Sequence, residues 1–172
     1  MTVTVRDARG QRADRLWIES VYRDYLDDLA PLNTGVFPAL GEFGHREPDQ
    51  LGRWFAEPGA QLLLILHDQT PAGFALVTPG GSVASSRGPR CDYRMAEFFI
   101  ARPQRRRGVG RSAMRLILDR FSGTWEIIEY LRNPGAVNFW RKVVAGYTGA
   151  NYEERVVNGE VRQTFTSGRR TR

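Results

Sequence analysis

Apolar and polar residues alternate at the start of the chain and then follow a helical spacing. Residues 2–8 (TVTVRDA) alternate and are rich in β-branched side chains, which predicts a first strand. From residue 12, apolar residues recur three and four positions apart, which predicts a helix that ends at Pro31 because proline cannot continue it. Prolines and glycines over 31–60 predict mostly loop, with one short helix around 48–56.

The middle of the chain is rich in predicted strands. Residues 61–68 and 71–79 are short apolar segments joined by a tight turn, which predicts a β-hairpin. A loop of small residues follows over 80–89. Residues 92–101 (DYRMAEFFIA) then predict a long buried strand.

The last part of the chain alternates between helices and strands. Its predicted elements are a helix with one buried face at Met114, Ile117, Leu118 and Phe121, a strand over 124–132, a helix over 133–146, and strands over 152–157 and 160–166. The Asn-Gly pair between the last two strands is typical of a type I′ turn. The order β, α, α, three strands, α, β, α and two strands predicts a mixed α/β fold.

Length and composition indicate one globular domain. The 172 residues are 41% hydrophobic and 26% charged, so we expect a single domain over 1–172 with a frayed tail over 167–172. The first residues lack the pattern of a signal peptide, and the longest apolar run, 62–66, is too short to span a bilayer. We therefore expect a cytoplasmic protein with no membrane association. One cysteine and two histidines are too few for a typical zinc site, so we expect no metal, with an all-oxygen site left open.

The chain is basic, and its charge is concentrated in one segment. A net charge of +6 and a pI near 10.1 favour an anionic partner such as nucleic acid, a membrane surface or a phosphate-rich ligand. Only one of the 25 basic residues is lysine, so this bias can also reflect the coding habits of the source genome. Seven arginines nevertheless fall between residues 102 and 120, beside Gly108 and Gly110.

A strand that runs into a glycine turn and then a helix is suited to bind an anion, because the first amide groups of the helix lack partners. The phosphate-loop pattern G-x-x-x-x-G-K-[ST] is absent. The dinucleotide pattern G-x-G-x-x-G is only partly matched, because Ala113 takes the place of its third glycine. A solvated basic turn or a nucleic-acid patch is the alternative, although residues 102–115 lack the aromatic side chains typical of single-strand binding surfaces.

Two motifs resemble those of one superfamily. Residues 105–110 (RRRGVG) match R-x-x-G-x-G, the pyrophosphate-binding turn of the GNAT superfamily of acetyl-CoA-dependent N-acetyltransferases. Asn133, Ala136, Phe139 and Trp140 match its N-x-x-A-x-x-F-[YW] pattern, and the resemblance covers roughly residues 92–152. It implies one GNAT-like α/β (α+β) domain: a mixed, mostly antiparallel sheet flanked by helices, whose splayed central strands form the cofactor cleft.

The resemblance also implies the acetyl-CoA site. Backbone groups of Phe99 and Ile100 would contact the pantetheine arm, and the phosphate cradle would comprise Arg105, Arg106, Arg107, Gly108, Val109, Gly110, Arg111 and Ser112. Each arginine taken singly could equally be a surface residue. Asn133 could be only a helix cap or also contact the cofactor, and Phe139 could belong to the core, the cofactor face or both.

Glu97 is the candidate catalytic residue. A carboxylate inside an apolar strand can take the proton that an amine must lose before acetylation, and an ion pair with arginine is the structural alternative. Trp140 stands where the family often has a tyrosine acid, and an indole N–H cannot supply a proton. Either Tyr147 or Tyr152 serves instead, or no acid is needed because a thiolate is a tolerable leaving group; we favour the latter.

These features predict an N-acetyltransferase for a primary amine of a small molecule or peptide, with no nucleic-acid partner. We expect residues 1–90 to form the acceptor side and 91–166 the acetyl-CoA side. The acceptor should be cationic, because the first part of the chain is acidic at Glu19, Asp24, Asp27, Asp28, Glu42, Glu47 and Asp49. A non-catalytic acyl-CoA-binding module and a basic nucleic-acid-binding domain remain the alternatives, and a homodimer is left open.

Overall fold

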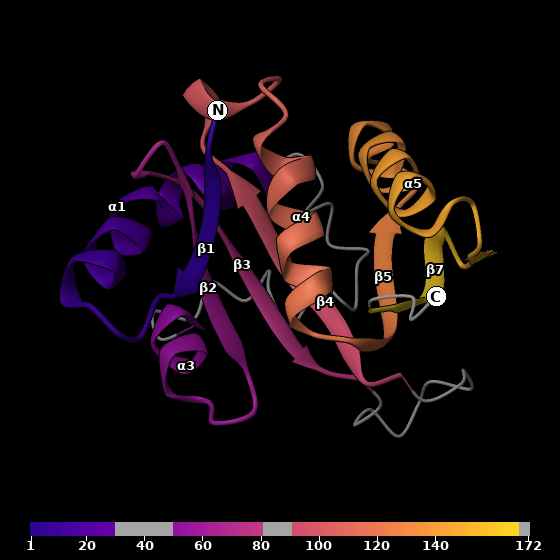
Figure 1. Ribbon diagram of the computed structural model, residues 1–172, viewed down its shortest axis with the longest axis horizontal. Coiled ribbons are helices and arrows are strands. Elements are labelled where there is room, and N and C mark those ends of the chain that lie inside the picture. Colours follow the sequence, from indigo (N-terminus) through magenta and orange to yellow (C-terminus); the bar gives the residue numbers. More distant parts are fainter. Residues whose placement is uncertain (30–49, 81–90, 169–172) are drawn as a thin grey trace.

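The structure of the protein, a computed structural model, describes residues 1–29, 50–80 and 91–168 (Figure 1). Its strands are β1 (Val3–Asp7), β2 (Gln61–His67), β3 (Thr70–Pro79), β4 (Tyr93–Ile100), β5 (Gly123–Tyr130), β6 (Glu153–Val157) and β7 (Glu160–Ser167). Its helices are α1 (Arg12–Leu29), α3 (Gln50–Ala56), α4 (Val109–Arg120) and α5 (Pro134–Thr148), with a 3-10 turn, η2 (Arg102–Gln104). Each helix and strand predicted from the sequence is present.

One seven-stranded sheet organises the domain, in the order β1-β2-β3-β4-β5-β7-β6. Neighbouring strands are antiparallel except β4 and β5, which run parallel. The prediction of a mixed, mostly antiparallel sheet flanked by helices is confirmed. Asn158 and Gly159 between β6 and β7 have φ values of 52° and 79°, the pair of positive angles that a type I′ turn requires.

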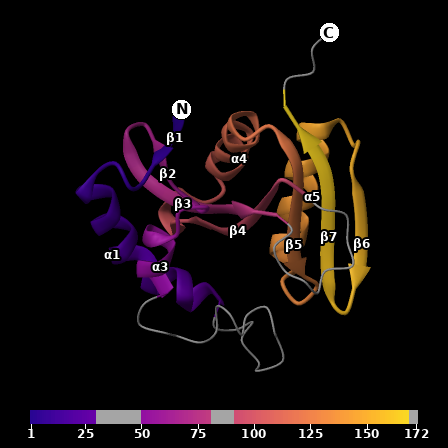
Figure 2. The same ribbon diagram turned by 90° about the horizontal axis from the view of Figure 1, so that it is seen from below.

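Helices cover both faces of the β1–β4 half of the sheet (Figure 2). On one face, Met114 and Ile117 of α4 belong to an apolar core that continues beneath α5 and includes Trp125 of β5. On the opposite face, α1 and α3 bury a second core through Ile18 and Trp54. The sheet therefore separates two apolar layers, and α1 with α3 lies on the side away from α4.

The burial of β4 differs from the prediction of a uniformly buried strand. Only Met95, Glu97 and Phe99 are buried, and the residues between them are partly exposed. β4 pairs with β5 only at its first two residues, so the sheet is not continuous beside the rest of the strand.

Strand β7 includes Ser167, which we expected to begin the frayed tail over 167–172. The Ser167 hydroxyl donates to the Phe121 carbonyl and accepts from Trp125 Nε1, both at 2.9 Å. These bonds fix the strand end, so the prediction was wrong at Ser167. Residues 169–172 lie outside the described part of the chain.

A buried carboxyl group lies on the α5 side of β5. Glu129 is 4% exposed, and neither of its carboxyl oxygens has a hydrogen-bond partner among the described residues. Trp125 and Ile127 lie four and two residues before Glu129 on β5, so the three side chains share a face, and both apolar residues belong to the core there. Burial first and the negative charge of Glu154 second raise the pKa of Glu129 to about 8, against an opposing effect of Arg141.

We expect Glu129 to make the free energy of unfolding fall as the pH rises. The folded protein keeps this proton up to a pKa of about 8, whereas the unfolded chain releases it near a pKa of about 4.3. Between these values the folded state binds more protons, so raising the pH favours unfolding. Between about pH 5 and pH 8 this group should lower the free energy of unfolding by about 1.4 kcal/mol per pH unit, and Glu129→Gln should abolish that fall. Urea unfolding at several pH values checks this, and equal pH dependence in both proteins would contradict it.

Candidate active site

The central strands β4 and β5 separate soon after they start. Their parallel ladder contains only the pairs Tyr93–Trp125 and Arg94–Glu126. Among the described residues, β4 therefore has no strand partner on its β5 side from Met95 to Ile100. The backbone groups along this edge are suited to pair with an extended ligand. The predicted splay of the central strands is confirmed.

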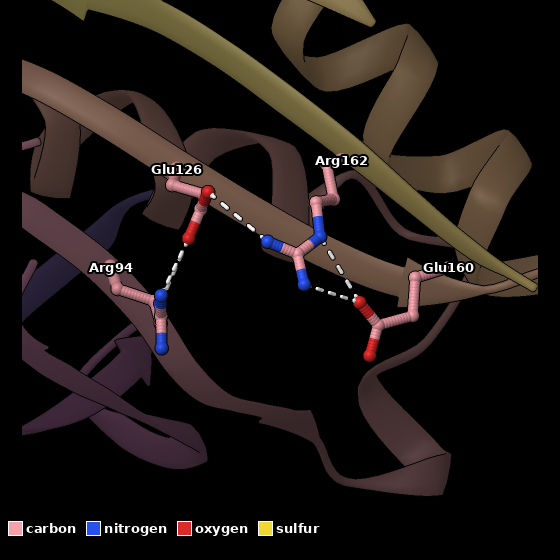
Figure 3. A network of polar contacts seen from close by, with 4 residues as sticks. All are labelled: Arg94, Glu126, Glu160 and Arg162. Atoms are coloured by element: carbon pink, nitrogen blue, oxygen red, sulfur yellow. Dashed lines mark hydrogen bonds and ion pairs between the residues drawn. The ribbon is translucent and has the colours of Figure 1, made fainter. Parts of the chain in front are cut away.

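A network of charged side chains spans the point where the two strands separate (Figure 3). Arg94 Nη2 donates to Glu126 Oε1 at 2.6 Å, and Arg162 Nη1 lies 4.0 Å from Glu126 Oε2. Arg162 also donates to Glu160 at 2.7 Å. Glu126 thus ties β4 to β5 and β7 where the backbone ladder ends.

The glycine turn leads from β4 into α4 with two left-handed residues. Arg106 has φ 63°, and Gly108 at the N-cap of α4 has φ 78°, a conformation that glycine adopts without steric cost. No side chain caps the helix, and its first intrahelical bond runs from Ser112 N to Gly108 O at 3.1 Å. The amide groups of residues 109–111 therefore have no partner within the described part of the chain, and they are suited to bind an anion at the positive end of the helix dipole.

Gly110 of α4 lies close to side chains of both α5 and β4. A Cβ atom at this position would lie 3.2 Å from the Phe139 ring and 3.5 Å from Ile100 Cγ1. The Phe139 ring in turn stacks on Phe98, with the ring centroids 5.8 Å apart. A side chain here would press on the aromatic ring beside the open edge of β4, and the ring would have to shift by a few tenths of an ångström.

The arginines of the turn fall into two groups. Arg105 donates from Nε to the Ile100 carbonyl at 2.7 Å and from Nη2 to Asp28 at the end of α1. Arg107 makes a long contact, 3.4 Å, with Gln104. Arg106 and Arg111 are exposed, and among the described residues neither forms an ion pair. Of the four arginines in the predicted cradle, Arg106 and Arg111 have no described ion pair, Arg107 has one long contact, and Arg105 is engaged within the protein.

The other predicted cofactor residues combine structural and exposed groups. Val109 is 1% exposed and Phe99 is buried, so each can offer a ligand only its backbone. Asn133 Oδ1 accepts from Ala136 N at 3.1 Å, which confirms the helix-cap interpretation. Phe139 is partly buried against the α4–α5 core, which agrees with a packing role and leaves part of its ring accessible.

Glu97 lies on β4 at a break in register. Leu76 pairs with Glu97 while Val77 pairs with Met95, so one residue of β4 is left over and the strand bulges. The Glu97 side chain is buried (6% exposed), and its Oε1 has no hydrogen-bond partner among the described residues. Burial raises the pKa of Glu97 well above its ordinary value. The ion pair with arginine considered as the alternative is not formed with any described arginine.

Tyr22 of α1 is a neighbour that the sequence did not single out. Burial, and secondly the negative charge of Glu97, raise the pKa of the Tyr22 phenol. Its ring packs edge-on against Trp54, 5.6 Å between centroids. Helical spacing indicated that Tyr22 faces the interior, but nothing in the sequence indicated which strand residue it would approach.

The two tyrosines considered as proton donors lie elsewhere. Tyr147 donates from its hydroxyl to Asp119 at 2.7 Å. Tyr147 and Tyr152 line a pocket of about 710 Å³ at the carboxyl ends of α4 and α5, and its walls include neither Glu97 nor the glycine turn. Trp140 is buried, 5.3 Å from Phe98 and 5.0 Å from Phe139 between ring centroids.

The acidic first part of the chain is partly neutralised. Asp28 pairs with Arg102 and Arg105, and Glu19 pairs with Arg15. Asp24 and Asp27 are exposed, whereas Glu42, Glu47 and Asp49 lie outside the described residues. The described acids therefore provide less free negative charge than the sequence suggested.

Residues 1–29, 50–80 and 91–168 contain no helix long and apolar enough to cross a membrane. Over the same ranges, no three His, Cys, Asp or Glu side chains gather as a candidate metal site. His67 contacts Gln104 through Nδ1 at 2.7 Å, and Cys91 is a free thiol.

Strands β4 and β5 separate beside the start of α4, whose N-cap is Gly108 and which no described side chain caps. This combination is the one expected of an acetyl-CoA-dependent acyltransferase fold. Residues 9–147 match the sequence model of the Acetyltransferase (GNAT) family, and the chain belongs to that family. An acetyltransferase from Thermus thermophilus has a similar structure, with TM-score 0.65 and 16% identity over 96% of this chain and 97% of that one. No curated protein matches the sequence.

Two further solved structures with similar folds carry substrate names. A spermidine N-acetyltransferase chimera that includes the Vibrio cholerae enzyme aligns with TM-score 0.58 and 15% identity over 96% of both chains. The ribosomal-protein-S18-alanine N-acetyltransferase from Escherichia coli aligns with TM-score 0.53 and 10% identity over 98% of this chain and 96% of that one. At these identities the similarity shows the fold alone.

Proposed function

We propose that the protein is an N-acetyltransferase that moves an acetyl group from acetyl-CoA to a primary amine of a small molecule or peptide. The observation that carries this proposal is Glu97, a buried carboxyl group without a described partner on the strand that leads into the glycine turn. Membership of the GNAT family supports acetyl-CoA as the donor. Two structural neighbours named for amine acceptors, spermidine and an alanine of a ribosomal protein, are consistent with this acceptor class.

Coenzyme A would be held by the turn and by the open edge of β4. The free amides of residues 109–111 suit a pyrophosphate, and the exposed side chains of Arg106 and Arg111 add positive charge. Backbone groups of Phe99 and Ile100 suit the extended pantetheine arm. Capping uses Oδ1 of Asn133 and leaves its Nδ2 donors for the ligand. When bound, acetyl-CoA supplies the acetyl group as an activated thioester.

Glu97 would accept the proton that the amine must lose. An alkylammonium has a pKa of about 10.4 and cannot act as a nucleophile while protonated. The raised pKa of Glu97 is closer to that of the amine, which reduces the cost of proton transfer. As the new N–C bond forms and the C–S bond breaks, the proton passes to the Glu97 carboxylate, directly or through water.

No general acid is required for the departing thiolate. A thiol has an ordinary pKa of about 8.5, so the thiolate is a tolerable leaving group at neutral pH. Tyr147 already donates its proton to Asp119, and the Trp140 indole cannot supply one. We therefore assign the chemistry to Glu97 alone among the described residues.

Two measurements test the proposal in sequence. Acetyl-CoA should raise the melting temperature of the protein, because a ligand that binds only the native state stabilises it. Thiol release in the presence of a panel of amines should then identify turnover. Stabilisation without turnover for any amine would favour a non-catalytic acyl-CoA-binding module, and no stabilisation at all would overturn the proposed cofactor.

A further inference from the structure

An ion-pair cluster joins the end of α1 to the glycine turn. Arg105 donates to one carboxylate oxygen of Asp28, and Arg102 donates to the other at 3.3 Å. Arg105 also donates from Nε to the Ile100 carbonyl at 2.7 Å, and its guanidinium carbon lies 5.6 Å from the centre of the Phe99 ring. One side chain thus contacts α1, the last residue of β4 and the aromatic ring beside it.

The Arg105–Asp28 pair is partly sheltered from solvent, whereas Arg102 is 68% exposed. The Asp28 side chain is 26% exposed and the Arg105 side chain 37% exposed, whereas Arg106 beside it is exposed and forms no ion pair with a described residue. Neighbouring arginines of the same motif therefore have different environments. A partly buried pair that belongs to a network of several charges holds its geometry better than an isolated surface pair.

We propose that Asp28 and Arg105 are positioning residues for the coenzyme A-binding turn, an inference that rests on the proposed function. Asp28 holds the Arg105 guanidinium, and Arg105 holds the junction between β4 and the turn. The phosphates of the ligand are met by the α4 amides with Arg106 and Arg111, not by Arg105. Asp28, on helix α1 of the half expected to bind the acceptor, thereby fixes the shape of the glycine turn expected to bind coenzyme A.

The first test uses the protein without ligand. Asp28→Asn keeps the shape of the side chain but removes its charge, and Asp27→Asn is the matched control because Asp27 is exposed on the same helix turn. Hydrogen exchange of the amides over residues 101–108 should be about 10-fold faster in Asp28→Asn than in wild type, and unchanged in Asp27→Asn. Equal exchange in all three proteins would overturn the inference, whether or not the protein binds coenzyme A.

The second test measures coenzyme A binding by calorimetry. Asp28→Asn and Arg105→Gln should each weaken affinity about 10-fold, and the double variant should bind no more weakly than Arg105→Gln alone, because both changes break one linkage. Asp28→Glu keeps the charge and should restore most of the affinity. Additive losses in the double variant, or affinity unchanged in Asp28→Asn, would contradict the inference. Failure of the wild type to bind coenzyme A would instead count against the proposed function.

Steady-state kinetics separates positioning from catalysis. Asp28→Asn should raise the KM for acetyl-CoA about 10-fold and change kcat at saturating acetyl-CoA less than about 2-fold. A general loss of folded structure would lower the apparent kcat without this selective change in KM. A fall in kcat with an unchanged KM for acetyl-CoA would show that Asp28 does not act through the turn.

Discussion

Glu97→Gln is expected to lower turnover about 10²-fold or more while coenzyme A affinity changes little. The amide is close in size to the carboxyl group but cannot accept a proton from the amine at neutral pH. Glu97 lies on β4 before the glycine turn, so the change leaves the turn and the α4 amides intact. Thiol release at saturating substrates measures turnover, and calorimetry measures coenzyme A binding.

Glu129→Gln is the matched control for this variant. Glu129 is also a buried glutamate without a described hydrogen-bond partner, but it lies on β5 facing the core beneath α5. Its replacement should leave turnover within about 3-fold of wild type, as expected for a residue outside the site. Wild-type turnover in Glu97→Gln would show that Glu97 is not the proton acceptor.

The pH dependence of turnover gives a second signature of Glu97. Burial raises its pKa, so the carboxylate form needed to accept a proton becomes more populated as the pH rises. Turnover should therefore rise with pH. Glu97→Gln should lose the part of this rise that occurs before the unbound alkylammonium itself loses its proton.

Amines should also be better acceptors than acidic amino acids. An active enzyme that preferred acidic acceptors would contradict this assignment of the acceptor side.

Gly110→Asp should reduce coenzyme A affinity at least about 100-fold. A Cβ atom there lies 3.2 Å from the Phe139 ring, so the ring must move, and the carboxylate adds negative charge beside the amides proposed to bind the pyrophosphate. Calorimetric titration with coenzyme A measures the loss. Affinity equal to that of wild type would show that coenzyme A does not bind at the glycine turn.

Two control variants show how much of the loss in Gly110→Asp comes from the added charge, from the contact with Phe139, and from placing an aspartate on any helix. Gly110→Ala introduces the contact with Phe139 without the charge, so the further loss in Gly110→Asp measures the electrostatic part. Gly146→Asp places the same side chain on α5, where a Cβ atom meets no other atom within 4 Å. It should bind coenzyme A as tightly as wild type. The melting temperature without ligand shows whether each protein is folded.

The elements of this fold were predictable because local patterns encode them. The helical spacing before Pro31 indicated α1, and the Asn-Gly pair indicated the last hairpin, since each depends on residues close in the chain. The strand, glycine turn and helix around Gly108 likewise form one continuous segment. The sequence therefore located the candidate cofactor turn as well as the strand that carries Glu97.

Features that depend on distant segments were not predictable. Asp28 and Arg105 are 77 positions apart, and periodicity says nothing about which charged side chains will meet. Asp28 consequently looked like free negative charge at the acceptor entrance instead of a partner of the turn. The exposure of alternate residues in β4 depends on where β5 leaves it, which is a property of the assembled sheet. The approach of Tyr22 to Glu97 was hidden for the same reason.

The two-residue ladder between β4 and β5 also bears on how the two halves of the sheet are joined. Strands β1–β4 and strands β5–β7 are each held by long ladders, whereas the halves share two backbone pairs, the Arg94–Glu126 ion pair and the apolar core beneath α4 and α5. An extended ligand bonded along the free edge of β4 would add backbone hydrogen bonds beside this short ladder. Ligand binding should therefore strengthen the region where the two halves of the sheet meet.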